Sequence, residues 1–124
     1  MLEVKPVQTK EEQQKICELC RVEFNPDCLA YKTTENGKII GIAQFRIFGG
    51  YAVIYDLKTI DGINDSGVLI IMGKAALNFI NSCGVKEVIL KEENSYLLQI
   101  LGFTLNSGGV YKLNLEGYFE CEHK

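Results

Sequence analysis

The sequence predicts an α+β fold, in α/β/α layers, built on a mixed and mostly antiparallel sheet of about six or seven strands. Residues 51–60 are rich in β-branched and aromatic residues and predict a strand. Residues 67–82 contain no proline and are too long for a strand in a chain of this size, so they predict a helix. A further strand is expected over residues 86–90, after the helix-ending glycine Gly84. This βαβ unit predicts one parallel crossover.

The first elements are expected to be an edge strand and a helix. Residues 2–7 predict a strand near an edge of the sheet, because Pro6 cannot donate a hydrogen bond to a neighbouring strand. Thr9 and Glu12 have the spacing of a capping box and predict a helix that Asn25-Pro26-Asp27 interrupts. The buried face of this helix is predicted from four residues that recur at helical intervals: Ile16, Leu19, Cys20 and Phe24.

Turn residues predict the remaining strands. Residues 29–34 and 38–48 flank Asn36-Gly37, a pair that favours a type I′ hairpin because both residues tolerate positive φ. Gly49-Gly50 predicts a second reversal into residue 51. After the βαβ unit, residues 95–101 predict a short helix. A closing hairpin is expected around residues 106–109, with strands over residues 103–105 and 110–115.

The composition predicts one globular domain, residues 1–124, in the cytoplasm. Hydrophobic residues make up 47% of the chain, and 13 basic residues against 16 acidic ones give a net charge of −3. Lys and Arg form no cluster, so nucleic acid is not an expected partner. The longest apolar run, residues 68–72, is too short to span a membrane, and the first residues lack the apolar core of a signal peptide.

The five cysteines predict reduced thiols, because their number is odd and their spacing shows no disulfide framework. Cys17 and Cys20 form a C-x-x-C pair within the predicted helix, and the one histidine, His123, is in the tail. The pair is therefore interpreted as two partly buried helix residues, with a redox or metal site as the alternative.

Four stretches, in this order, resemble the GNAT-type N-acetyltransferases, which use acetyl-coenzyme A. The hairpin 35–41 is similar to the family's dGkivG motif. Residues 54–59 and 84–90 resemble its fourth and fifth strands, and Leu101-Gly-Phe103 resembles its klGF ending. The resemblance spans nearly the whole chain and implies the same fold, with acetyl-coenzyme A as the cofactor.

In the family, backbone amides of a glycine-rich loop before the central helix hold the pyrophosphate of coenzyme A. The matching residues are 64–69, of which Gly67 alone keeps the motif, and Leu69 stands where the family has a small residue. Asp65 adds a carboxylate beside the expected phosphates. Its alternative interpretation, shared with Ser66, is a helix N-cap. The residues expected to bind the cofactor are Leu57, Lys58, Thr59, Ile60, Asn64, Ser66, Gly67, Val68, Leu69 and Asn94.

The resemblance also suggests catalytic residues. Asp56 occupies a position where many relatives have a glutamate and is a candidate base; alternatively it is a strand carboxylate paired with Lys58. The family commonly has a tyrosine as general acid four residues before the Gly-Phe glycine, where this chain has Leu98. Tyr96 is the candidate acid instead, or it packs its ring on the sheet.

The resemblance therefore suggests transfer of an acetyl group to a primary amine of a small molecule or peptide. One alternative is a non-catalytic GNAT-fold module that binds or associates, including as a homodimer, through its apolar central helix. A third hypothesis is a sensor that binds an acidic metabolite at the same helix end. No metal is expected.

Overall fold

The computed structural model describes residues 1–63, 65–91, 95–106 and 108–119. Their seven-stranded sheet has the order β1-β2-β3-β4-β5-β7-β6. The strands are β1 (Leu2–Pro6), β2 (Leu29–Glu35), β3 (Lys38–Ile47), β4 (Tyr51–Thr59), β5 (Glu87–Leu90), β6 (Thr104–Leu105) and β7 (Tyr111–Asn114). The helices within these residues are α1 (Lys10–Cys20), α2 (Ser66–Ser82) and α3 (Ser95–Leu101). The predicted fold class is confirmed.

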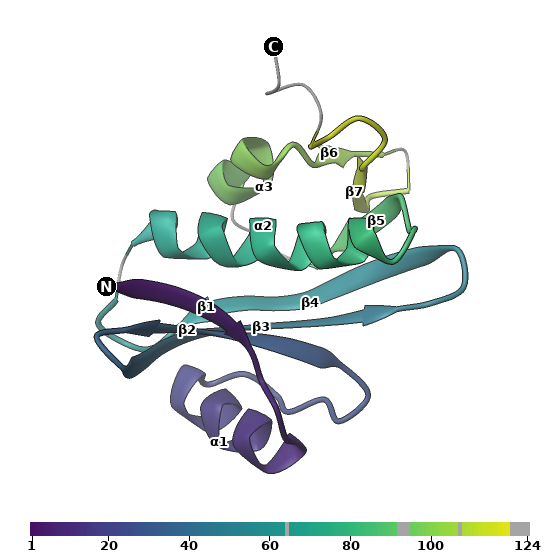
Figure 1. Ribbon diagram of the computed structural model, residues 1–124. Coiled ribbons are helices and arrows are strands. Elements are labelled where there is room, and N and C mark those ends of the chain that lie inside the picture. The colour runs from purple at the N-terminus through teal and green to yellow at the C-terminus, as the bar shows by residue number, and fades with distance from the viewer. Residues whose placement is uncertain (64, 92–94, 107, 120–124) are drawn as a thin grey trace.

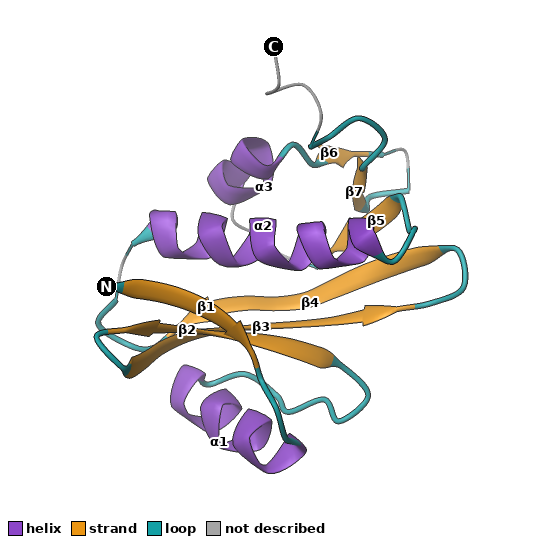
Figure 2. Ribbon diagram, in the orientation of Figure 1, coloured by secondary structure: helices purple, strands orange, loops and turns teal. Residues whose placement is uncertain are grey.

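Helices cover both faces of the sheet, as Figures 1 and 2 show: α1 packs on one face, and α2 and α3 lie on the other. Each face has its own apolar core. The smaller core, under α1, consists of Ile16, Cys17, Cys20, Ala30 and Ile42. The larger core lies under α2 and α3 and includes Phe45, Ile54, Met72, Leu77 and Leu101. The sheet is therefore the middle layer of three.

The first four strands pair in chain order and antiparallel, as the predicted reversals at Asn36-Gly37 and Gly49-Gly50 require. Asn36 and Gly37 adopt φ values of 54° and 83°, as a type I′ turn requires, so this turn prediction is confirmed. Between β3 and β4 the register shifts: Gln44 pairs with Asp56, but Phe45 pairs with Ile54. Tyr55 is consequently an extra residue in β4, a β-bulge that locally alters the course of the strand.

The βαβ unit is confirmed, because β4 and β5 are parallel, from the pair Tyr51 and Glu87 to the pair Ile54 and Leu90. The helix between them begins at Ser66, one residue before the predicted start, and Gly84 follows it with a φ of 85°. α3 packs closely on this helix at Gly73. A Cβ at that glycine would lie 2.9 Å from a methyl carbon of Leu101.

Two predictions for α1 were wrong. The helix ends at Cys20, before residues 25–27, because Arg21 adopts a left-handed conformation with a φ of 60°. Phe24 therefore lies outside the helix. Leu19 was expected on the buried face but is 57% exposed, and Gln13 and Cys17 are buried there instead. At 100° per residue, Leu19 lies about 110° from the centre of the face that the buried residues define.

The start of α1 and the closing hairpin follow the sequence more closely. The Thr9 hydroxyl accepts a hydrogen bond from the N–H of Glu12 at 3.0 Å, as a capping box requires. The Glu12 carboxylate returns to the N–H of Gln8 at 3.3 Å, one residue before the usual partner. β6 and β7 pair as an antiparallel hairpin. No helix of the described ranges is long and apolar enough to span a membrane.

Candidate active site

β4 and β5 separate halfway along β4, and this leaves an open strand edge. Ile54 is the last residue of β4 that pairs with β5, and its carbonyl accepts a hydrogen bond from the N–H of Lys91 at 3.0 Å. β4 continues to Thr59 with β3 on its other side. Residues 55–59 therefore have a paired edge toward β3 and an open edge toward the diverging β5.

Alternation along the strand identifies the N–H groups on the open edge. The N–H of Ile60 donates to the carbonyl of Ile40 in β3 at 2.9 Å. Because backbone groups of successive residues point to opposite sides of a strand, Lys58 also points toward β3, whereas Leu57 and Thr59 point toward the open edge. Of the four residues predicted to bind the cofactor here, only these last two have N–H groups in a suitable position.

The N-terminus of α2, at the same end of the molecule, is capped by Asp65. One carboxylate oxygen of Asp65 accepts a hydrogen bond from the N–H of Gly67 at 2.9 Å, and its backbone carbonyl accepts from the N–H of Val68 at 3.2 Å. In a helix that begins at Ser66, the N–H of Leu69 pairs with the same carbonyl. The N-cap interpretation of Asp65 is confirmed. Of the four N–H groups in the first turn of α2, residues 66–69, these contacts leave only that of Ser66 for an anion.

The open edge and the helix end differ in how well they suit acetyl-coenzyme A. The open-edge N–H groups of Leu57 and Thr59 can donate to the carbonyl groups of an extended ligand chain. At the helix end, the exposed carboxylate of Asp65 opposes a pyrophosphate, and no Lys or Arg lies between Lys58 and Lys74. Asn64 and Asn94, two other residues expected to bind the cofactor, lie outside the described residues.

Asp56 lies on the face of β4 that α1 covers, opposite to the face covered by α2. It lines a cleft of about 420 Å³. The cleft is lined by Glu23, Phe24, Asn25, Pro26, Tyr55 and Asp56. The side chain of Asp56 is half-buried, and its Oδ2 accepts a hydrogen bond from Nε2 of Gln44 at 2.7 Å. The structure shows no ion pair between Asp56 and Lys58, so the expected alternative partner is replaced by a glutamine.

Burial raises the pKa of Asp56 above its usual value, since a charged carboxylate loses hydration there. The hydrogen bond from Gln44 and the charge of Lys58 act in the opposite direction, and the charge of Glu23 adds to the increase in pKa. A carboxyl group with a raised pKa beside a cleft is the arrangement expected of a general base.

Sequence reasoning missed Gln44 and its neighbour Gln13, which are 0% and 2% exposed. A signal for both was present. Gln44 interrupts an apolar run in a strand that is central to the sheet, and Gln13 stands at helical spacing from Ile16 and Cys17. A buried amide needs hydrogen-bond partners, so such a position marks a polar network in the core.

α3 places the two candidates for the general acid differently. Tyr96 is 55% exposed in the first turn of this helix, and Leu98 is 1% exposed in the core. The position that carries the family's tyrosine is therefore a packing position in this chain.

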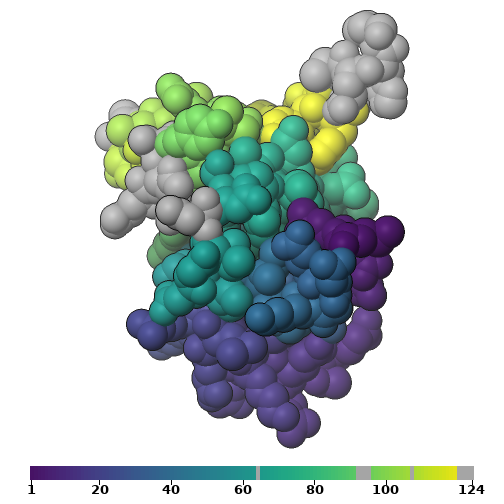
Figure 3. All heavy atoms as spheres, turned by 90° about the vertical axis from the view of Figure 1, so that its left-hand side faces the viewer, coloured from purple at the N-terminus to yellow at the C-terminus, as the bar shows by residue number. Residues whose placement is uncertain are grey.

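Figure 3 views the end of the molecule where β4 ends and α2 begins, with the α1 region below and the α3 region above.

The C-x-x-C cysteines have the character of core residues. Cys17 and Cys20 are both 1% exposed, and burial raises the pKa of each thiol to about 11. Thiols of this kind are poor nucleophiles and poor metal ligands. Both are free, as are Cys28 and Cys83. The described residues contain no cluster of His, Cys, Asp and Glu that could hold a metal ion.

No family model matches the chain, and no curated protein sequence matches it. Solved structures do. The PaiA N-acetyltransferase from Thermoplasma acidophilum, in complex with coenzyme A, is 12% identical with a TM-score of 0.72; the alignment covers 92% of this chain and 99% of that one.

A GNAT family acetyltransferase from Brucella melitensis, in complex with acetyl-coenzyme A, is 13% identical with a TM-score of 0.73 over 92% and 88% of the two chains. The Escherichia coli ribosomal-protein-S18-alanine N-acetyltransferase is also 13% identical, with a TM-score of 0.70 over 90% and 89%. Despite the low identity, the whole architecture corresponds. The chain has the fold of the GNAT-type N-acetyltransferases.

Proposed function

We propose that this protein transfers an acetyl group from acetyl-coenzyme A to a primary amine by direct attack, with Asp56 as the base. The observation that carries the proposal is the position of Asp56. Asp56 lines a cleft and has a raised pKa. It lies on β4, and the edge of β4 that faces β5 is open beyond Ile54. A base on one side of β4 and free N–H groups along its edge are the two elements that such a transfer requires.

Backbone groups of β4 and α2 would hold the cofactor, which supplies an activated acetyl thioester. The N–H groups of Leu57 and Thr59 bind the pantetheine chain and polarise the thioester carbonyl. The N–H of Ser66 at the start of α2 binds a phosphate oxygen, and Gly67 and Leu69 contribute the adjoining wall. Tyr96, exposed in the first turn of α3, remains the candidate acid for the departing thiolate.

The lining of the cleft favours a cationic acceptor. It includes two carboxylates, Glu23 and Asp56, and no Lys or Arg. A primary amine is protonated at neutral pH and must lose a proton before it attacks. The raised pKa of Asp56 makes this residue a better acceptor for that proton, directly or through a water molecule. The acceptor is accordingly a small molecule or peptide that presents a protonated amine.

Mass spectrometry of amine mixtures incubated with acetyl-coenzyme A tests the proposal. The wild type should acetylate at least one primary amine, and Asp56→Asn should lower kcat/KM by a factor of roughly 10² or more while cofactor affinity is unchanged. Glu18→Gln removes an exposed carboxylate of α1 and is the matched control, with unchanged turnover. Equal turnover by Asp56→Asn would exclude Asp56 as the base.

The capping of α2 by Asp65 favours a second candidate, a non-catalytic GNAT-fold module. Local hydrogen bonds already use the N–H groups of Gly67 and Val68, so the cofactor loop has lost part of its binding capacity. If the protein neither binds acetyl-coenzyme A nor acetylates any amine, this module becomes the better account. Self-association by light scattering would then be the measurement to make.

A further inference from the structure

A buried hydrogen-bond network lies behind Asp56, between α1 and the sheet. Its centre is Gln44 of β3, and Gln13 of α1 lies next to it; both side chains are almost fully buried. A buried amide group without hydrogen-bond partners would be strongly destabilising. The partners of Gln44 and Gln13 therefore define the network.

Gln44 has all four of its hydrogen-bonding positions filled. Its Nε2 donates to the carbonyl of Glu23 at 2.9 Å and to Oδ2 of Asp56 at 2.7 Å. Its Oε1 accepts from Nε2 of Gln13 at 2.8 Å and from the backbone N–H of Asn25 at 3.2 Å. A side-chain amide has two donor hydrogens and two acceptor sites, and here each one is occupied.

The orientation of the Gln44 amide follows from its partners. The backbone N–H of Asn25 can only donate, so Oε1 must face it and Nε2 must face Asp56. The amide of Gln13 is oriented in the same way, because its Oε1 accepts from the ammonium group of Lys10 at 3.1 Å. The hydrogen bonds therefore run in one direction, from the ammonium of Lys10 to the carboxylate of Asp56.

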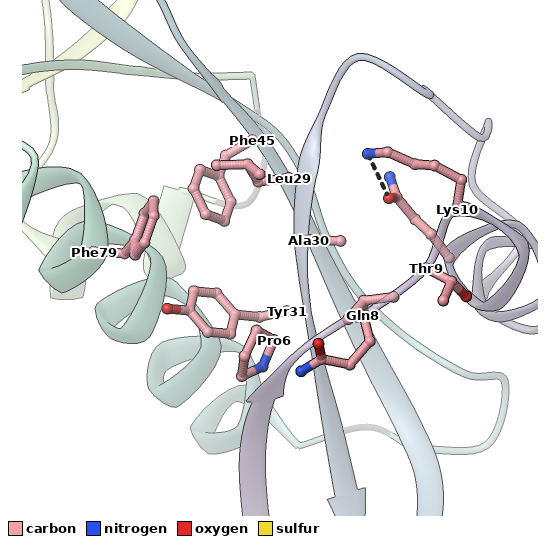
Figure 4. Close-up of a pocket in the computed structure, with 11 residues that line it drawn as sticks. Pro6, Gln8, Thr9, Lys10, Leu29, Ala30, Tyr31, Phe45 and Phe79 are labelled. Atoms are coloured by element: carbon pink, nitrogen blue, oxygen red, sulfur yellow. Dashed lines mark hydrogen bonds between the residues drawn. The ribbon is translucent and has the colours of Figure 1, made fainter.

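Lys10, at the start of this network, does not line the cleft beside Asp56. It lines a separate cavity of about 230 Å³ beside β1 and β2, where Figure 4 shows its hydrogen bond to Gln13. The cavity wall includes Tyr31, Phe45 and Phe79 and does not include Asp56. Gln13 contacts Asp56 through Gln44, and its Nε2 also donates to the carbonyl of Asn25 at the cleft at 3.1 Å.

Other charged and titratable groups act on Asp56 from each element around it. They are Glu23 of the segment after α1, Lys58 of β4, Cys17 of α1 and Cys28 before β2. Gln44 is the hydrogen-bond donor to Asp56 in the described part of the chain, and the other oxygen, Oδ1, has no such donor there. One oxygen is thus held by the network, and Asp56 itself lines the cleft.

We propose that Gln44 is the positioning residue of this site and that Gln13 orients it, so that Asp56 is held by Oδ2 and offers Oδ1 to the acceptor amine. The proposal rests on the proposed function, in which Asp56 is the base. Gln44 is absent from the cleft lining, so it acts through Asp56 and not on the substrate. Its donor both fixes the side-chain conformation of Asp56 and favours the ionised form that can accept a proton.

Three methionine variants test the proposal: Gln44→Met, Gln13→Met and, as a control, Gln14→Met on the exposed face of α1. The readouts are the pKa of Asp56, from carboxyl carbon NMR shifts against pH, and kcat and KM for the acceptor. In Gln44→Met the pKa of Asp56 should rise because the carboxylate loses its hydrogen-bond donor, and kcat should fall about tenfold because the side chain is no longer held in place, with cofactor affinity unchanged. Gln13→Met should give smaller changes in the same direction, and Gln14→Met should match wild type.

A second variant addresses misfolding, because Gln44→Met removes a hydrogen-bond partner from four groups: the Glu23 carbonyl, the Asn25 N–H, Nε2 of Gln13 and Oδ2 of Asp56. Gln44→Glu keeps the shape of the side chain and brings a second carboxyl group against Asp56. Two such groups share a proton, so the higher apparent pKa of the pair should exceed that of Asp56 in wild type. Gln13→Met also leaves both donor contacts of Gln44 in place.

Failure of this proposal can be distinguished from failure of the proposed function. If the pKa of Asp56 and kcat are unchanged in both Gln44 variants while Asp56→Asn still lowers kcat/KM by a factor of roughly 10² or more, the positioning role is overturned and the proposed base is not. Full turnover by Asp56→Asn would instead overturn the assignment of Asp56 as base, and with it the role of Gln44. The expected rise in pKa together with lower kcat supports both.

Discussion

The proposed acceptor side and the proposed cofactor side satisfy their polar groups in different ways. On the acceptor side, Asp56 receives a hydrogen bond from Gln44, whose amide is held in turn by Gln13 and Asn25. These partners come from α1, from the segment after it and from β3. On the cofactor side, Asp65 caps the N–H of Gly67, two residues further along the chain.

This difference shows which side retains a specialised arrangement. Burial of polar groups from distant segments costs desolvation free energy. Such a network beside a cleft is therefore expected where the carboxylate that it contacts has a function. A helix cap is a common local solution that stabilises α2 with no ligand present. The proposed acceptor side therefore has the character of a built site, whereas at the proposed cofactor side local capping uses backbone N–H groups that a ligand would otherwise bind.

The largest effect on this comparison is expected from Leu98→Tyr, which restores the family's residue on the cofactor side. Because Leu98 is 1% exposed, the larger side chain should overpack the core and lower the free energy of unfolding by about 1–3 kcal/mol. Ile100→Tyr, at an exposed position of the same helix, should change it by less than about 0.5 kcal/mol. Urea unfolding measures both, and a stable Leu98→Tyr with higher turnover would show that the hydroxyl position is still usable.

An intermediate effect is expected from Asp65→Arg, which replaces a repulsive charge by an attractive one near the pyrophosphate. Affinity for acetyl-coenzyme A should increase several-fold at low salt, about 1 kcal/mol, and the gain should shrink as salt rises. Asp65→Asn retains the cap and removes only the charge, so it should give a smaller gain without loss of stability. A gain for Asp65→Arg that does not depend on salt would mean that Asp65 acts through packing.

The smallest effect is expected from Asp56→Asn on stability. Burial raises the pKa of Asp56, so the folded protein holds this proton more tightly than the unfolded chain does. Its contribution to stability is therefore present below the unfolded pKa of about 4 and is lost as pH rises through the folded pKa. Asp56→Asn should stabilise the protein more at pH 7 than at about pH 3.5, by less than about 1 kcal/mol because solvent screens a half-buried group. A variant that is relatively less stable at pH 7 would contradict this sign.

The sequence predicted most of the fold because its signals are local. The hairpin at Asn36-Gly37, the cap at Thr9 and the glycine after α2 each depend on a few neighbouring residues. The buried face of α1 was predicted less well. Leu19 was chosen for its hydrophobicity, whereas the fold buries Gln13, whose partners are distant in the sequence.

The site shows the same division between local and long-range contacts. The cap formed by Asp65 could be anticipated from residue type and position alone. The bulge at Tyr55 and the contact between Gln44 and Asp56 could not, because both depend on the register between β3 and β4. The expected pairing of Asp56 with Lys58 rested on their nearness in the sequence. Gln44 on the neighbouring strand is the hydrogen-bond partner instead.

Calorimetric titration of the wild-type protein with acetyl-coenzyme A tests the central claim most directly, because every proposed role requires this molecule at the open edge of β4. We expect saturable binding to one site per chain, with a weak Kd between about 10 μM and 1 mM. Binding should be tighter in Asp65→Arg and unchanged in Asp56→Asn. Absence of saturable binding at about 1 mM cofactor in both the wild type and Asp65→Arg would show that the open edge of β4 does not bind acetyl-coenzyme A.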